Sequence, residues 1–243
     1  MKGATDEEPP GWQQRFGVVC GITDRRSGSL GLSLPDPSQD VMQRLREFRA
    51  AMRPAFTAFQ MAHQVHGTEV IWHEGVAPGW HVKDDADGHA TSQQGLLLSV
   101  TVADCVPIYL VHRDGLAVAL LHAGWRGVAG GMLRSGLMIL AARSGATPGD
   151  LVMHCGVAIC GSCYEVGEEV ARAVLGPRAK GGKQKIDLRA ELARQASELG
   201  VEDATISSLC SRCNNDRFFS HRANGDGGRQ IAYLGLPLRG ASH

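Results

Sequence analysis

Three short segments place soft or titratable side chains beside apolar stretches. They hold His66 in the QVHG of residues 64–67, Cys105 in the ADCVP of residues 103–107, and His122 in the HAGWRG of residues 122–127. Two imidazoles and one thiolate are ligands of the zinc-tripod type, which leaves a fourth coordination position open for water or substrate. Taken singly, such a histidine is usually a hydrogen-bonded structural residue, and such a cysteine is usually a small buried hydrophobe. The three together favour a metal site.

These residues support more than one chemistry. A Zn²⁺ held by one thiolate and two neutral imidazoles carries a charge of about +1, which favours bound hydroxide or a phosphate oxygen. The same residues fit a metal-free cysteine hydrolase, with Cys105 as nucleophile, His122 as base, and Asp104 or Asp87 as the carboxylate that orients the base. They also fit one blue-type copper. A multicopper cluster is not expected, because none of the ten histidines forms a His-x-His pair.

Arg126 is a candidate anion-binding residue. It follows Trp125 directly before a predicted helix, so backbone N–H groups and the helix dipole would face an anion beside it. Arginine also suits bidentate anion contacts. The alternative is that Trp125 packs in the core and Arg126 pairs with a carboxylate.

Two CxxC pairs, Cys160/Cys163 and Cys210/Cys213, compete for a metal. The 46 residues between Cys163 and Cys210 exceed the spacing of about 15–20 residues that is usual for a four-cysteine zinc site. We therefore expect unpaired thiols in turns, with a shared structural zinc as the alternative. The remaining cysteines, Cys20 and Cys155, lie in strand-like runs that predict core positions.

The elements that must position these groups follow from hydrophobic periodicity. We expect strands at residues 16–23, 56–62, 69–72, 96–102, 106–111, 116–121 and 151–157, near residue 206, and at 230–234. Helices are expected through Met42, Leu45 and Phe48, and at residues 127–143, 167–175 and 187–199. Residues 112–115 predict a hairpin turn, and residues 180–185 a flexible loop. Because strands outnumber helices and cluster centrally, the fold class is α+β, or mixed α/β, on a sizeable sheet.

Composition limits the domain organisation and the partners. Residues 1–14 are acidic and polar and predict a loosely ordered tail, followed by a single domain at residues 15–243. The 25 basic and 25 acidic residues give zero net charge, which argues against a nucleic-acid partner. No run of 18 apolar residues and no apolar leader is present, so we expect no membrane partner and a cytoplasmic protein that acts on a small molecule. Nothing in the sequence indicates the oligomeric state.

These motifs, in this order, resemble the YfiH-like, or laccase-domain, family, whose members carry the names polyphenol oxidase and purine nucleoside phosphorylase. The resemblance runs from Phe16 to Leu236. Besides the three segments above, it includes YEVG at residues 164–167, CSRCN at 210–214, FFSHR at 218–222 and GR at 228–229. Counting FFSHR and GR as one closing block, six such motifs in register are far more specific than any one of them.

The resemblance implies a fold of two packed β-sheets flanked by helices, in α/β/β/α layers like a class of cysteine hydrolases. It implies that His66, Cys105 and His122 are metal ligands and the reaction centre, with Zn²⁺ as cofactor and Cu²⁺ as the alternative. The implied reactions are phosphorolysis of adenosine, inosine and methylthioadenosine, and deamination of adenosine, with purine nucleoside and phosphate as substrates. The alternatives are a Cys105–His122 hydrolase or amidase that edits cell-wall precursors, and a copper-dependent polyphenol oxidase.

The resemblance also suggests residues that bind substrate. Arg25 falls where the family has an arginine after the first strand. Arg49 falls where the family has an Asn-Arg pair, although Phe48 replaces the asparagine here. With Arg126, these two residues are the candidates for holding phosphate and substrate.

Overall fold

Alternating side chains along the central strands build two sheets that pack face to face. The structure, a computed structural model, describes residues 5–6, 9–31, 38–225 and 227–240. One sheet has the order β1 (Thr5–Asp6), β2 (Val19–Thr23), β14 (Gln230–Leu236), β7 (Leu96–Val102), β3 (Ala58–Ala62), β5 (Gly79–Lys83). The other has the order β13 (Asp203–Ile206), β10 (Leu151–Cys155), β8 (Val106–His112), β9 (Val118–Ala123), β6 (Gly88–Thr91), β4 (Val70–His73).

Strand β7 shows how the sequence makes both faces of a sheet apolar. Leu96, Leu98 and Val100 join the core between the two sheets, whereas Leu97 belongs to the core on the opposite face. Successive side chains of a strand point to opposite faces, so a continuous apolar run is buried on both sides. Pairing of β7 with β14 is antiparallel and with β3 is parallel, which makes the sheet mixed.

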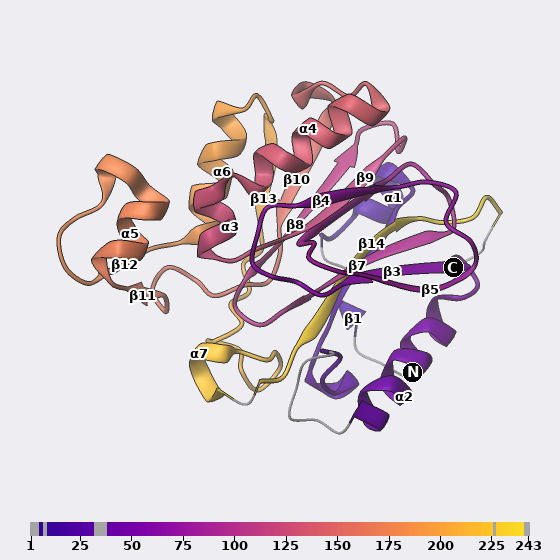
Figure 1. Ribbon diagram of the computed structural model, residues 1–243, viewed down its shortest axis with the longest axis horizontal. Coiled ribbons are helices and arrows are strands. Elements are labelled where there is room, and N and C mark those ends of the chain that lie inside the picture. Colours follow the sequence, from indigo (N-terminus) through magenta and orange to yellow (C-terminus); the bar gives the residue numbers. More distant parts are fainter. Residues whose placement is uncertain (1–4, 7–8, 32–37, 226, 241–243) are drawn as a thin grey trace.

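Helices cover the outer face of each sheet (Figure 1). Helix α2 (Ser38–Met52) packs on the first sheet through Leu45 and Phe48, whereas Met42 is exposed. Helices α3 (Trp125–Gly130), α4 (Met132–Ser144) and α6 (Leu188–Glu198) cover the second sheet. The α+β class and the α/β/β/α layers expected from the sequence are therefore confirmed.

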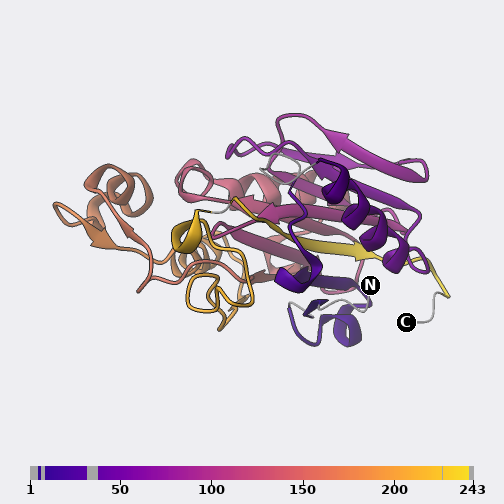
Figure 2. The same ribbon diagram turned by 90° about the horizontal axis from the view of Figure 1, so that it is seen from below.

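A smaller unit extends from this body. Helix α5 (Glu168–Leu175) and the two-stranded sheet of β11 (Glu165–Val166) and β12 (Gln184–Lys185) project to one side in both views (Figures 1 and 2). Strand β12 lies in the segment that was expected to be only a flexible loop. The short helix α7 (His221–Asn224) follows a loop and precedes β14.

The structure also differs from the expected elements near the N-terminus and after β9. The helix predicted at residues 127–143 is two helices, because Gly131 has a φ of 90° and ends α3 before α4 begins. The strand predicted from residue 16 begins at Val19, because α1 (Trp12–Phe16) precedes it. Within the segment expected to be a loose tail, residues 5–6 pair with β2 and Trp12 is only 3% exposed, since its indole packs in the core between the sheets. In the described residues, no helix is long and apolar enough to span a membrane.

Candidate active site

A strained turn presents His66. The residue lies between β3 and β4 with a φ of 60°, in the left-handed region that non-glycine residues rarely adopt. The fully buried carboxylate of Asp87 holds this turn by accepting hydrogen bonds from the backbone N–H groups of Val65, His66 and Gly67 at 3.1, 3.0 and 2.7 Å. Backbone strain of this kind persists only where the surroundings fix it, and it is concentrated at functional sites.

Cys105 and His122 come from one hairpin. Cys105 directly precedes β8 and His122 is near the end of β9, and these strands pair so that Pro107 is opposite His122. Asp87 links the QVHG turn to this hairpin. Its carboxylate holds the turn, and its backbone carbonyl accepts a hydrogen bond from the His122 backbone N–H at 2.7 Å. His66, Cys105 and His122, which are up to 56 residues apart in the sequence, are therefore brought together by the pairing of β9 with β6 and β8 and by the Asp87 carboxylate.

The three predicted ligand residues form one cluster. A ring nitrogen of each histidine and the Sγ of Cys105 all lie within 4.8 Å of one another. The imidazoles of His66 and His122 are 4.9 Å apart between ring centroids, at an interplanar angle of 80°. Gly124 makes room for the cluster, since a Cβ there would lie 3.1 Å from the Cys105 Sγ and 3.2 Å from the His66 Cδ2.

Asp87 also fixes the orientation of His122. Its Oδ1 lies 2.8 Å from His122 Nδ1, and both side chains are buried. A proton on Nδ1 donated to Asp87 leaves the Nε2 lone pair for the cluster, the arrangement found at metal-bound histidines and in catalytic triads alike. Of the two carboxylates considered from the sequence, Asp87 contacts His122. Asp104 does not, because it accepts hydrogen bonds from the Ser211 hydroxyl at 2.6 Å and the Arg222 backbone N–H at 2.7 Å.

The cluster is polarised as an ion pair. Burial alone would raise the pKa of Cys105, but the charge and hydrogen bond of His122, together with His66, lower it to about 6. Burial alone would lower the pKa of His122, but Cys105 and Asp87 raise it to about 9. Although burial disfavours its charge, Asp87 has a lowered pKa because it accepts hydrogen bonds from His122 and the backbone. A thiolate at neutral pH is the form that binds a metal or attacks a carbonyl.

A cavity of about 460 Å³ opens onto this cluster. Its volume is within the range of small-molecule sites. The lining includes His66, Cys105 and His122, three arginines (Arg126, Arg222 and Arg229), two further histidines (His63 and His221), and Tyr164.

The three arginines make the cavity cationic. The Arg126 guanidinium lies 4.2 Å from the centroid of the Trp125 ring, and that of Arg222 lies 4.9 Å from the centroid of Tyr164. Arg222 and Arg229 donate to backbone carbonyls. Among the residues that the structure describes, none of the three has a carboxylate side chain as partner, so their charges are available to an anion.

The other two predicted substrate residues lie elsewhere. Arg25 is not among the residues that line the cavity: its Nε donates to the carbonyls of Asn215 and Phe218, and its guanidinium is 4.4 Å from the centroid of the Phe219 ring. It thus supports the loop that leads to His221. Arg49 is on α2, with its guanidinium 5.7 Å from the centroid of Phe59, and it does not line the cavity either. The resemblance gave the sequence positions of both arginines, but it carried no information on whether their side chains line the cavity.

Sequence reasoning gave no role to several residues that line the cavity. Arg222 and Arg229 were noted only as parts of the closing FFSHR and GR motifs. A signal was present there, since an arginine and a histidine directly follow a buried Phe-Phe-Ser stretch whose three side chains are at most 8% exposed. His63 precedes the QVHG motif and Tyr164 begins the YEVG motif, so both were likewise adjacent to recognised features.

The chain is similar to known proteins over most of its length. Residues 13–237 match the family model described as "Multi-copper polyphenol oxidoreductase laccase". "Purine nucleoside phosphorylase YlmD" of Geobacillus stearothermophilus is 31% identical, over 90% of each protein. "Adenosine deaminase RL5" of an unknown prokaryotic organism is 37% identical over 58% of each protein. The crystal structure of a hypothetical protein YfiH from Bacillus licheniformis superposes with a TM-score of 0.83 at 25% identity, covering 93% of this chain and 94% of that one.

The match to the family model covers nearly the whole chain, including every residue of the cluster and its cavity. Two of these matches, YlmD and the YfiH structure, cover 90% or more of the chain, and the match to RL5 covers 58% of it. The chain therefore belongs to the multi-copper polyphenol oxidoreductase laccase family, the YfiH-like, laccase-domain proteins that its motifs resemble.

Proposed function

We propose that this chain is a zinc-dependent purine nucleoside enzyme. It would cleave adenosine, inosine and methylthioadenosine with phosphate, and deaminate adenosine. The observation that carries the proposal is that the His66–Cys105–His122 cluster lines the same cavity as three arginines, none of which has a carboxylate partner among the described residues. The names of the relatives, purine nucleoside phosphorylase and adenosine deaminase, support this substrate class.

The donor set fits a zinc ion. One thiolate and two imidazoles are ordinary zinc ligands, and ligand atoms within 4.8 Å of one another can converge on one ion. Asp87 supplies the carboxylate that such a histidine requires, and Gly124 leaves the space beside the ligands. A bound Zn²⁺ would supply Lewis acidity and an acidified water molecule. Cu²⁺ is the alternative ion for the same donors.

The family's name implies several copper ions, but the residues of this chain do not fit a multicopper cluster. Among the described residues, only two groups of side chains can hold a metal: this cluster and a set of four cysteines. Neither resembles the histidine-rich cluster that a multicopper oxidase needs. A single-copper polyphenol oxidase remains the alternative for the His66–Cys105–His122 cluster.

The chain's own residues have distinct roles in this proposal. Arg126, Arg222 and Arg229 bind phosphate, because charge-assisted hydrogen bonds from guanidinium groups are strong and directional. Asp87 holds His122 in one tautomer. Phosphorolysis also needs a proton for the departing purine, and His63 and His221 are the imidazoles in the cavity lining outside the cluster.

A second candidate function rests on one specific observation. Cys105, His122 and Asp87 also have the connectivity of a nucleophile–base–carboxylate triad, with a thiol whose pKa is about 6. Such a triad would serve a metal-free hydrolase or amidase acting on cell-wall precursors. The zinc proposal explains one residue that the triad leaves without a role, since a hydrolase of this type needs a single imidazole and His66 is a second one.

Two variants separate these functions. Adenosine is incubated with the purified protein, with and without phosphate, and the products are separated by chromatography. Adenine that forms only with phosphate indicates phosphorolysis, and inosine indicates deamination. We expect Cys105→Ala and His66→Ala each to abolish turnover and to lose one metal ion per chain. Full activity in His66→Ala, or in wild-type protein stripped by a chelator, would overturn the zinc proposal and favour the triad.

A further inference from the structure

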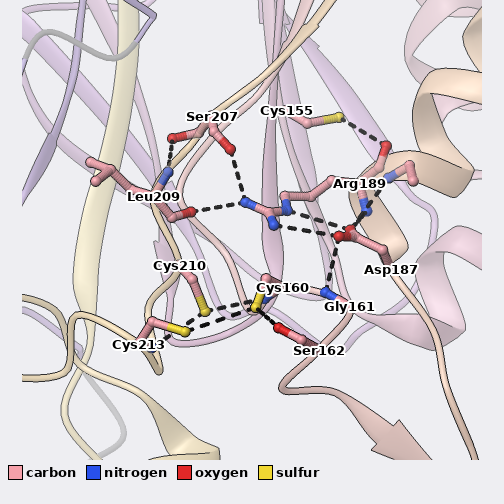
Figure 3. A network of polar contacts seen from close by, with 11 residues as sticks. Cys155, Cys160, Gly161, Ser162, Asp187, Arg189, Ser207, Leu209, Cys210 and Cys213 are labelled. Carbon is pink, nitrogen blue, oxygen red and sulfur yellow. Dashed lines mark hydrogen bonds and ion pairs between the residues drawn. The ribbon is translucent and has the colours of Figure 1, made fainter.

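Four cysteines outside the candidate active site form a second cluster. Cys160 and Cys163 lie in the turn after β10, and Cys210 and Cys213 lie in the loop after β13. All four Sγ atoms are within 4.8 Å of one another, although 46 residues separate the two pairs in the sequence. Figure 3 shows Cys160, Cys210 and Cys213 directed toward one another.

The sulfur spacing fits a tetrahedral metal ion. Four sulfurs at the usual Zn–S distance of about 2.3 Å lie about 3.8 Å apart. The Sγ of Cys213 is 3.4 Å from that of Cys163 and 4.0 Å from that of Cys160. These values bracket the tetrahedral spacing, and they exceed the S–S bond length of about 2.05 Å. All four cysteines are free.

Backbone N–H groups from both CxxC turns hold the Cys210 sulfur in place. Cys210 Sγ accepts hydrogen bonds from the backbone N–H groups of Cys160 at 3.2 Å and Cys213 at 3.4 Å. The donor at Cys160 belongs to the other CxxC turn, so this contact joins the two pairs.

The scaffold around the sulfurs fixes both turns. A parallel bridge joins Ala158 to Cys210, and the Ser211 backbone N–H donates to the Ala158 carbonyl at 3.1 Å. Asp187, the N-cap of α6, accepts from the Gly161 backbone N–H at 3.0 Å. A Cβ at Gly161 would lie 2.9 Å from the Asp187 Cβ, so the turn can approach the helix this closely only with glycine.

A buried arginine anchors the second loop to the same helix. Arg189 is 5% exposed, and its Nη1 donates to the carbonyls of Ser207 and Leu209 at 3.0 and 2.8 Å. Its remaining donors face the Asp187 carboxylate, as Figure 3 shows. One ion pair thus holds the segments that carry both cysteine pairs.

We propose that Cys160, Cys163, Cys210 and Cys213 together bind one Zn²⁺ ion in a tetrahedral, four-thiolate site. Four protein ligands leave no coordination position for water, so the site is structural and distinct from the His66–Cys105–His122 cluster. Its role is to link the turn after β10 to the loop after β13. The proposal does not depend on the proposed nucleoside activity.

This link supports the wall of the active-site cavity. Ile159 and Tyr164, which flank the first cysteine pair, both line the cavity. Ser211, within the second pair, donates its hydroxyl to Asp104 at 2.6 Å, and Asp104 directly precedes Cys105. Loss of the zinc would therefore loosen the positions of the cavity wall and of the strand end that carries the thiolate.

The test is metal content combined with X-ray absorption at the zinc edge. Wild-type protein is expected to hold two zinc ions per chain. The Cys105→Ala variant keeps the four cysteines, so it should hold one zinc ion surrounded by sulfur alone at about 2.3 Å. The double variant Cys160→Ser/Cys163→Ser should also hold one, with a mixed nitrogen and sulfur shell. The control Ser208→Ala changes an exposed serine in the second loop, keeps all four thiols and should hold two.

The outcomes distinguish this site from the candidate active site. A Cys105→Ala protein without zinc, or with a zinc shell that contains nitrogen, would overturn the four-thiolate site. So would a Cys163–Cys213 disulfide found by mass spectrometry in protein prepared without oxygen. If Cys160→Ser/Cys163→Ser fails to fold, the Cys105→Ala measurement still decides the question. Failure of the proposed function would instead appear as absence of nucleoside turnover with both zinc ions present.

Discussion

The substitution Asp87→Asn tests how the candidate active site is assembled. The Asp87 carboxylate accepts four hydrogen bonds: Oδ1 from His66 N and His122 Nδ1, and Oδ2 from Val65 N and Gly67 N. An asparagine has one acceptor oxygen, so it can satisfy only one of these two pairs. Its amide N–H₂ must then face the other pair of donors.

Either orientation of the asparagine weakens metal binding. If its N–H₂ group faces His122, the imidazole must carry its proton on Nε2, the atom that would ligate the metal. If its N–H₂ group faces Val65 and Gly67, the strained turn of His66 loses its anchor. A lost partner of this kind typically lowers metal affinity by about 10–100-fold, or about 1.4–2.7 kcal/mol. We expect a zinc affinity lower by this factor at the His66–Cys105–His122 site.

The assay is competition for zinc with a chromophoric chelator, which resolves the two proposed sites as separate phases. Only the phase of the His66–Cys105–His122 site should shift in Asp87→Asn. The matched control is Asp24→Asn, which changes another buried carboxylate, one that contacts Arg26 rather than His122 and does not line the cavity. It should leave this zinc affinity unchanged. An Asp87→Asn protein that binds zinc within about twofold of wild type would refute the reasoning, because loss of the carboxylate that orients a metal-bound histidine normally changes the affinity by more than that.

Three further predictions concern the same site. Gly124→Ala should lower the free energy of unfolding by about 1–3 kcal/mol, because the added Cβ overpacks against Cys105 and His66, and it should weaken zinc binding. Chemical denaturation that shows no change would contradict the Cβ distances of 3.1 Å to Cys105 Sγ and 3.2 Å to His66 Cδ2. In metal-free protein, the rate at which iodoacetamide alkylates Cys105, followed by peptide mapping, should rise as pH increases through about 6. The reason is that the thiolate forms above the lowered pKa and is lost below it. A midpoint near the ordinary pKa of 9 would be inconsistent with the ion pair. Arg126→Ala should raise the KM for phosphate by about 10–100-fold, because it removes the equivalent of one charged hydrogen bond. The KM for nucleoside should stay nearly unchanged. Equal changes in both constants would argue against a phosphate role for Arg126.

The sequence predicted the centre of the molecule well. Strands β7, β8 and β10 are long apolar runs with clear ends, so their positions follow from hydrophobic pattern alone. The motifs that hold His66, Cys105 and His122 were recognisable because each lies beside the end of an apolar strand. The helix expected at residues 187–199 matches α6, because its ends carry local signals: the N-cap Asp187 and the left-handed Gly200.

Other elements lack a local signal. Strand β6 (Gly88–Thr91) is four buried residues with little apolar character, and it is a strand because β4 and β9 supply its hydrogen-bond partners. Strand β5 is similarly defined by its pairing with β3. Tertiary contacts of this kind override the weak strand preference of the residues themselves.

The two cysteine pairs show the same limit in the candidate sites. Their separation in sequence exceeds the usual zinc spacing, yet the bridge between Ala158 and Cys210 brings them together. The four thiols are free and lie in turns, as expected, but the spacing gave no sign that the two turns are adjacent. Spacing rules describe sites built from one local segment, and this cluster is built from two segments joined by the fold.

The most direct test of the account is product analysis with metal-free protein reconstituted with zinc. Adenosine would be supplied with and without phosphate, and adenine, ribose 1-phosphate and inosine would be quantified. Adenine and ribose 1-phosphate in equal amounts, formed only when zinc and phosphate are both present and lost in Cys105→Ala, is the predicted result. Nucleoside cleavage by the metal-free protein, or cleavage that does not depend on phosphate, would contradict the central claim that the His66–Cys105–His122 cluster holds a metal for phosphorolysis.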